Sequence, residues 1–217
     1  MVRVGRKAPA RGSRVEEAYH HLKLAIVSAK LPAGSLISEI DIARELGISR
    51  TPMREAIRQL ERDGLVVRFP NRGVFVRQVE MREVLEIWQI REWLEPIACE
   101  VAAKTIAPEP LQRLRQRMTE VRESVTGLEE HEVHHQLDLE LHAKILEAAG
   151  NITLQTLVDS LNIRVMQMRM VHRPDRLQAV IAEHIEILDA LLARDPYAAA
   201  NAMRKHLRNS RENLAFA

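Results

Sequence analysis

Residues 46–57 read LGISRTPMREAI, and this stretch decides the fold of the first third of the chain. Ser49 can cap a helix by accepting a hydrogen bond from a backbone N–H group. Pro52 falls in the first turn of that helix, where a missing N–H costs little. Gly64 is expected to end the helix. One face of the helix is apolar and should point into a core, with Met53, Ile57 and Leu60 at helical spacing.

The segments around this helix extend the pattern in both directions. They are a helix from Arg14 to the breaker cluster 31–34, a short helix over 39–46 that Gly47 ends, and a hairpin over 65–76. The hairpin is predicted because two β-branched or aromatic runs flank a short loop that contains glycine. Three helices followed by a hairpin is the order of a winged helix-turn-helix domain.

The composition limits the class of protein. The 217 residues are 46% hydrophobic and 29% charged, which is typical of a globular chain and excludes low-complexity disorder. The single cysteine, Cys99, excludes an internal disulfide framework and a cysteine-based zinc finger, and we expect it to be a small core residue. No apolar run is long enough to span a membrane, and no apolar segment follows the basic N-terminus, so a cytoplasmic protein is expected.

From Met81 onward the sequence pattern is helical throughout. Six or seven helices are expected, separated by breakers near Pro96, Pro108, Thr126, Gly150, Pro174 and Pro196. The predicted fold class is therefore mainly α, with an N-terminal winged helix-turn-helix and a C-terminal all-helical bundle. The expected organisation is a basic flexible arm over residues 1–13, the winged domain over 14–78 and the helical bundle over 81–217.

Charge is unevenly distributed between the two expected domains. Residues 1–80 carry a net charge of +6 (15 Lys and Arg against 9 Asp and Glu), whereas residues 81–217 carry −4 (17 against 21). A basic first domain on an acidic body indicates that the first domain binds a polyanion.

The helix that starts at Ser49 carries the strongest nucleic-acid signal. Arg50 and Arg54 lie four residues apart, opposite the apolar face, where an arginine fork can reach guanine O6 and N7 in a major groove. Arg72, beside Gly73 at the hairpin tip, is placed to enter a minor groove. A solvated helix face is the alternative interpretation of the two arginines. The residues expected to contact DNA are Ser49, Arg50, Thr51, Arg54, Arg72 and Gly73.

A second group of residues suggests a metal site in the helical bundle. Asp138 and His142 lie four residues apart, so both point from one face of a helix. His184 and His206 each lie on or beside an apolar stripe of their own helices. Imidazole and carboxylate ligands suit Zn, Ni, Fe or Mn as divalent ions. The spacing alone leaves open that these histidines are ordinary core residues.

Both halves of the chain resemble known bacterial regulators. Residues 31–34, 46–57 and 60–66 resemble the GntR family of transcriptional regulators. Residues 81–217 resemble the FCD effector domain of its FadR-type branch, through IREWLEP at 90–96, DLELH at 138–142 and EHIEIL at 183–188. In metal-binding members of that branch an aspartate and three histidines hold a divalent ion, and they match Asp138, His142, His184 and His206.

The resemblance implies a homodimer that binds a palindromic double-stranded DNA operator, with repression relieved by a ligand. A small organic acid is the expected effector, and its carboxylate would meet an arginine. Arg91 matches the family's arginine in the first helix of the effector domain, but an ion pair with Glu95 is an equally good interpretation. Arg169, in an otherwise apolar run, and Asn162 on the same helix are the other expected effector contacts.

Several polar residues near these motifs are expected to have no functional role. Glu140 and Glu183 are next to ligands in sequence but should point elsewhere on their helices, and Asn151 should cap a helix. The histidines expected to face solvent are His20, His21, His134 and His135.

Three alternative functions remain open at this point. A metalloenzyme with a nucleic-acid-binding domain is disfavoured because no nucleophile or acid–base pair accompanies the four ligands. A metal sensor, in which the ion is itself the signal, would bind DNA in a metal-dependent manner without an organic acid. A DNA-packaging protein would not need the large acidic helical body.

Overall fold

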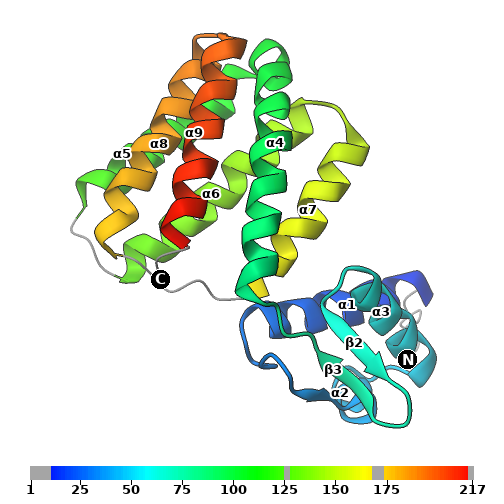
Figure 1. The fold of residues 1–217 in the computed structure, drawn as a ribbon. Helices are drawn as coiled ribbons and strands as arrows, with labels where there is room; N and C mark the ends of the chain where they lie inside the picture. The colour runs from blue at the N-terminus through cyan, green and yellow to red at the C-terminus, as the bar shows by residue number, and fades with distance from the viewer. Residues whose placement is uncertain (1–10, 125–127, 168–173, 215–217) are drawn as a thin grey trace, which may run out of the picture. The chain divides into compact units, whose positions relative to one another are not determined.

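The structure is a computed structural model, and it describes residues 11–124, 128–167 and 174–214. Within these ranges the chain forms nine helices and one three-stranded sheet (Figure 1). The predicted mainly-α fold is confirmed. The described residues form two compact units, one ending at Glu80 and also containing the end of α7, and one made of the remaining helices.

The first unit is a winged helix-turn-helix. Its elements are α1 (Arg11–Val27), β1 (Leu36–Ile37), α2 (Glu39–Glu45), α3 (Arg50–Arg62), β2 (Val66–Phe69) and β3 (Gly73–Val76). The strand order is β1-β3-β2, antiparallel throughout, with Val67 opposite Phe75. Strand β1 was not predicted, because two residues are too few to show an alternating pattern. Residues 1–10 of the predicted arm lie outside the described residues, and 11–13 begin α1.

One glycine and two serines occupy the positions that define α2, α3 and the turn between them. Gly47 has φ +62, a conformation that costs glycine little and other residues more. Ser38 caps α2 by accepting a hydrogen bond from the backbone N–H of Asp41 at 3.3 Å. Ser49 occupies the N-cap position of α3 as predicted, but its side chain makes no capping hydrogen bond. That part of the prediction was wrong, and the exposed hydroxyl is free to contact something else.

The second unit is a helical bundle. Its helices are α4 (Met81–Thr105), α5 (Pro108–Glu123), α6 (Leu128–Ala148), α8 (Pro174–Leu192), α9 (Pro196–Leu214) and the part of α7 (Ile152–Gln167) up to Leu161. Helix α4 packs along α9, α9 packs against α8, and α6 lies against α4 and α5 (Figure 1). None of the described helices has the length and apolar character that a membrane crossing requires.

Pro96 does not end a helix, although the sequence predicted a helix boundary there. Helix α4 continues through it for 25 residues in all. A proline inside a helix removes one hydrogen bond and costs about 3 kcal/mol. Pro96 is buried, and the packing of α4 against α9 offsets that cost. The prediction of a breaker at this position was wrong, and the bundle has six helices in the described part of the chain.

Arg194 joins the end of α8 to the end of α4. Its guanidinium donates hydrogen bonds to the backbone carbonyls of Lys104 (3.0 Å) and Ile106 (3.2 Å), with a longer contact to Ala103 (3.4 Å). The last carbonyls of a helix lack partners within the helix, so this side chain satisfies groups that would otherwise need water. Arg194 itself has φ +53, in the left-handed region.

Candidate metal centre and nucleic-acid interface

Three helices bring four potential metal ligands together. Helix α6 supplies Asp138 and His142, α8 supplies His184, and α9 supplies His206, with their ligand atoms all within 4.8 Å of one another. The Nε2 atom of His184 lies 3.0 Å from Asp138 Oδ1 and 3.3 Å from His206 Nε2. The Nε2 atom of His142 lies 3.4 Å from the same carboxylate oxygen. We call these four residues the metal-centre cluster.

The apolar pattern of each helix explains this convergence. Leu137 and Leu141 on α6 are fully buried, and they turn the face that carries Asp138 and His142 inward. Ile181 and Leu188 bury the stripe of α8 to which His184 belongs, and that histidine is 0% exposed. The spacing of four residues on α6 places the aspartate one helical turn from its histidine.

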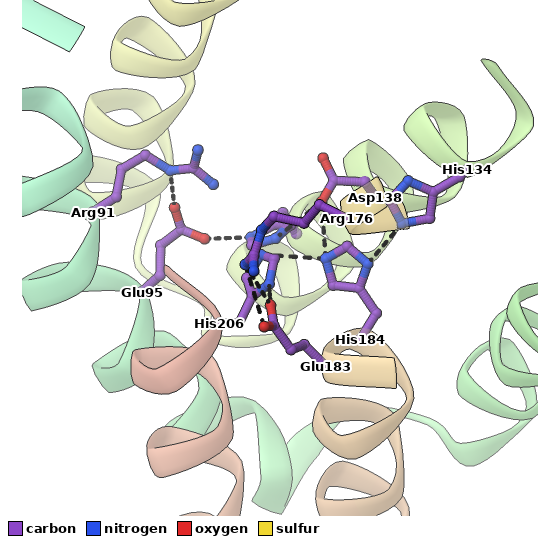
Figure 2. A network of polar contacts seen from close by, with 9 residues as sticks. Arg91, Glu95, His134, Asp138, Arg176, Glu183, His184 and His206 are labelled. Atoms are coloured by element: carbon purple, nitrogen blue, oxygen red, sulfur yellow. Dashed lines mark hydrogen bonds and ion pairs between the residues drawn. The ribbon is translucent and has the colours of Figure 1, made fainter. Parts of the chain in front are cut away.

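A carboxylate or an imidazole holds the other ring nitrogen of each histidine (Figure 2). Glu95 contacts His142 Nδ1, Glu183 Oε2 lies 3.0 Å from His206 Nδ1, and His134 Nε2 lies 3.1 Å from His184 Nδ1. Proteins use such contacts to fix the tautomer and the ring orientation of metal-binding histidines. Each Nε2 atom is thereby left directed at the other members of the metal-centre cluster.

Two sequence predictions about the residues that contact these histidines were wrong. Glu183 points toward His206 rather than away from the cluster, because α9 packs against that face of α8. His134 is 9% exposed rather than solvent-facing, because it precedes Asp138 by four residues and lies on the same face of α6. Glu95 was missed as a partner of His142, and its only sequence signal was its position four residues after Arg91.

Arginines balance the two buried glutamates. Arg91 donates from Nε to Glu95, and Arg176 lies 3.3 Å from both carboxylate oxygens of Glu183. Asn209 also donates to Glu183, at 2.7 Å. A buried charge is costly unless it is paired. In both pairs the glutamate can stay ionised, because the positive charge of the arginine neutralises its negative charge.

The pKa values in the region follow from these contacts. Burial raises the pKa of Glu95, but Arg91 and His142 outweigh it, and the value falls to about 2. Burial and the neighbouring His184 lower the pKa of His134 to about 3. His134 is therefore a neutral imidazole, and its Nε2 atom can accept a hydrogen bond if His184 carries its proton on Nδ1. Burial also raises the pKa of Asp138, but the neighbouring His142 and His184 outweigh this effect and hold the pKa well below the usual range.

The residues present fit a divalent metal ion. His142 Nε2 is buried and has no hydrogen-bond partner among the described residues, although buried polar atoms are nearly always paired. Three imidazole nitrogens and one carboxylate oxygen form a donor set that suits Zn, Ni, Fe or Mn. An ion at this point would satisfy the nitrogen that the protein leaves without a partner.

The structure gives different information on each of the three residues predicted to contact an effector. Arg91 is 7% exposed, pairs with Glu95 and lies 4.4 Å from the centre of the Trp88 ring, so the ion-pair interpretation describes its position. Asn162 is half-buried, and its Oδ1 atom has no hydrogen-bond partner among the described residues. Arg169 lies outside the described residues. An effector contact by any of the three stays a prediction.

The remaining polar predictions agree with the structure except for His21. His135 and His20 are exposed, whereas His21 is half-buried and lies 3.9 Å from Glu45. Glu140 points to Arg117 at 3.3 Å, away from the cluster. The helix-capping role of Asn151 is confirmed, because its Oδ1 accepts from the Leu154 N–H at 3.0 Å. Cys99 is fully buried, as expected of a core residue.

Helix α3 presents a basic face opposite its buried side. The buried side consists of Pro52, Met53, Ala56, Ile57 and Leu60. Arg50, Thr51 and Arg54 are exposed, as the spacing predicts. Arg58 is exposed four residues further along and was missed, although the same spacing of four marks it. The helix thus offers three arginines on successive turns.

Glu39, at the start of α2, orients two of the basic side chains in this unit. Its carboxylate lies 3.6 Å from Arg54 Nε and 3.3 Å from Arg68 Nη1. Both arginines remain largely exposed, so these contacts orient the side chains without burying them. At the wing tip, Arg72 is exposed and lies 5.8 Å from the Phe69 ring, while Gly73 has φ +106.

Both units match known families. Residues 14–76 match the gntR family of bacterial regulatory proteins, and residues 86–209 match the FCD domain. The chain belongs to the GntR family. This GntR-family regulator therefore has a helix-turn-helix domain that binds DNA operators and an FCD domain, which implies an effector. Regulators of this family usually act as dimers.

Curated relatives and solved structures agree with the assignment. The chain is 27% identical to the HTH-type transcriptional regulator YdhC of Bacillus subtilis, over 90% of this chain and 88% of that protein. It is 31% identical to a probable D-xylose utilization operon transcriptional repressor of Paenarthrobacter nicotinovorans, over 85% and 81%. The structure of Escherichia coli McbR/YncC shares the fold, with a TM-score of 0.77 at 22% identity, over 94% and 97%. The two curated relatives are transcriptional regulators, so the metalloenzyme alternative is rejected.

Proposed function

We propose that this GntR-family regulator is a repressor whose operator binding is controlled by a small organic acid at a metal-containing site in the FCD domain. The observation that carries the proposal is the convergence of three buried histidine nitrogens on Asp138, while His142 Nε2 makes no hydrogen bond to any of the described residues. The protein acts as a homodimer on a palindromic operator, which the pairing of two identical reading heads requires.

The charges of the site favour an anionic effector. Glu95 and Glu183 are each paired with an arginine, so the contacts behind the histidines add no net charge. Asp138 is the only carboxylate within the metal-centre cluster. A divalent ion held there supplies positive charge that one carboxylate does not neutralise, and this attracts an anion. A hydroxy acid or a dicarboxylic acid offers the oxygen atoms that such a site prefers.

The operator-binding part of the proposal is carried by the basic face of α3. Arg50 and Arg54 are exposed on successive turns of α3, the helix that follows the Gly47 turn. Ser49 keeps its hydroxyl free of capping, so it can donate to a backbone phosphate. The wing adds Arg72, beside Gly73, for a contact to the groove or to the backbone.

A metal sensor is the second candidate function. Arg91 is already held by Glu95 and covered by Trp88, so it is not free to bind an acid without rearrangement. A regulator of this kind would respond to the ion alone.

One experiment separates the two. The melting temperature and the operator affinity are measured for metal-free and metal-loaded protein, each with a panel of hydroxy and dicarboxylic acids. The proposed function requires an acid that raises the melting temperature only in the presence of metal and that changes operator affinity, since the two sites must be coupled. A change in operator affinity with metal alone, and no response to any acid, would establish the sensor instead. The Asp138→Ala variant is the control, and it should respond to neither.

A further inference from the structure

Two arginines lie behind the metal-centre cluster, and they are held very differently. Arg91 is buried, donates from Nε to Glu95 and lies over the Trp88 ring. Arg176, in the first turn of α8, has 17% of its side chain exposed and contacts a single residue, Glu183, among those that the structure describes. Arg176 is therefore the less tightly held of the two.

The contact between Arg176 and Glu183 uses one nitrogen of the guanidinium (Figure 2). Nη2 lies 3.3 Å from both carboxylate oxygens, whereas the strongest arginine–carboxylate pairs form two parallel bonds from two nitrogens. Within the described ranges, Nε and Nη1 of Arg176 donate no hydrogen bond. An arginine has five N–H donors and no acceptor, so most of the donors of this guanidinium are available to a further anion.

The hydrogen bonding of Glu183 does not depend on Arg176. Asn209 donates to Glu183 Oε1 at 2.7 Å, and Glu183 Oε2 lies 3.0 Å from Nδ1 of His206. Both distances are shorter than those to Arg176. What Arg176 adds is positive charge, and it adds that charge beside the residue that orients His206.

We propose that Arg176 binds the second carboxylate of a dicarboxylic effector whose first carboxylate is bound at the metal-centre cluster. The inference rests on the function proposed above and names the residue that selects the acid. Nη2 keeps its contact with Glu183, and the acid is bound by donors that Glu183 does not use. Arg91 has the same charge but is already occupied by Glu95 and covered by Trp88.

This arrangement favours an acid with two carboxylates over an acid with one. Malate and 2-hydroxybutyrate are matched probes, because they share a four-carbon chain with a hydroxyl beside one carboxylate, and a methyl group replaces the other carboxylate in 2-hydroxybutyrate. A hydrogen bond to a charged group is worth about 1.5–3 kcal/mol, which corresponds to about 10- to 100-fold in affinity. Malate should therefore bind Zn²⁺-loaded wild-type protein at least about tenfold more tightly than 2-hydroxybutyrate.

Replacing Arg176 should remove this preference. Arg176→Gln should bind malate about 10- to 100-fold more weakly, with little change for 2-hydroxybutyrate or for Zn²⁺ itself. Arg176→Lys keeps the charge without the fork and should recover part of the malate affinity. Arg117→Gln is the matched control, because Arg117 pairs with the exposed Glu140 and should bind both acids as the wild type does.

Calorimetric titration of the Zn²⁺-loaded full chain measures the acids, at concentrations that leave the metal content unchanged, and competition with a chromogenic chelator measures the ion. The comparison of the two acids on wild-type protein does not depend on any variant folding, and equal affinities there would overturn the proposal. A merely structural role of Arg176 would weaken the ion and both acids together, through Glu183 and His206, and that result would overturn it too.

The failure of this inference is distinguishable from the failure of the proposed function. Equal malate affinities in Arg176→Gln and Arg117→Gln would overturn the role of Arg176 and leave the metal-containing effector site standing. Metal-loaded wild-type protein that binds none of the hydroxy and dicarboxylic acids would overturn both.

Discussion

The Nε2 atom of His134 lies 3.1 Å from Nδ1 of His184, the most buried of the three histidines in the metal-centre cluster. The two rings stack with their centroids 5.2 Å apart. A neutral His134 can accept a proton from Nδ1 of His184, and that tautomer would leave the His184 Nε2 atom, 3.0 Å from Asp138 Oδ1, available to an ion. His134 is therefore placed to orient a proposed metal ligand without being one of the proposed ligands itself.

Replacing His134 should weaken ion binding without abolishing it. We expect His134→Ala to lower the affinity for a divalent ion by about 10- to 100-fold, the usual effect of removing a partner that orients a ligand. Competition with a chromogenic chelator measures this directly. His135→Ala is the matched control, since His135 is the exposed neighbour and should keep wild-type affinity. Equal affinities in the two variants would contradict the positioning role.

Loss of a proposed ligand should have a larger effect. Asp138→Ala and His184→Ala should each reduce the metal content of the purified protein and remove the rise in melting temperature on adding metal. An ion that binds only the folded state stabilises it by mass action, so chelation of the wild type should mimic both variants. Elemental analysis with thermal melting checks the result. Full occupancy in a His142→Ala/His206→Ala variant would refute the ligand set.

The buried Arg91–Glu95 pair should matter to folding even in the absence of metal. Glu95 is 1% exposed, so Glu95→Ala would leave Arg91 buried without its partner, and we expect a loss of about 3–5 kcal/mol in unfolding free energy. Urea denaturation of metal-free protein measures it. Glu140→Ala breaks the exposed ion pair with Arg117 and should cost less than about 1 kcal/mol. Similar losses in both variants would show that burial of the pair contributes nothing.

Measurements of operator binding should distinguish an arginine that contacts a base from an arginine that contacts only phosphate. Arg54→Ala should lose about 1–3 kcal/mol of discrimination at one base pair of each half-site if it reads a guanine. Arg72→Ala, if it meets only phosphate, should weaken all sequences alike and reduce the salt dependence by about one unit. Titrations of operator and scrambled DNA at several salt concentrations measure both. Normal operator affinity in Arg50→Ala/Arg54→Ala would remove α3 as the reading helix.

Local patterns were enough to predict much of this molecule. The apolar face of α3, the Gly47 turn and the wing depend on residues close in sequence, and the predicted order of elements was confirmed. Asp138 and His142 could be paired from their spacing alone, because four residues make about one helical turn.

The partners of the histidines could not be predicted, because they depend on how helices pack. Glu183 is followed directly by His184, and sequence reasoning turned it away from the cluster for that reason. In the structure α9 approaches that side of α8, and His206 meets Glu183 there. His134 and His135 were both assigned to solvent as residues that precede the motif, yet neighbouring side chains on a helix point about 100° apart, so one can be buried while the other is exposed. Pro96 was taken as a breaker, and tertiary packing overrode its local preference.

The contact between Arg194 and the end of α4 bears on how the metal-centre cluster would take up an ion. Helix α4 carries Glu95, and α8 carries Glu183 and His184, so Arg194 ties together the two helices that supply most of the support for the cluster. A non-glycine residue with positive φ is sterically costly, and its retention here is explained by those hydrogen bonds. These hydrogen bonds hold the end of α8 against the end of α4, so an ion bound at the cluster would enter a scaffold whose helices are already joined at one end.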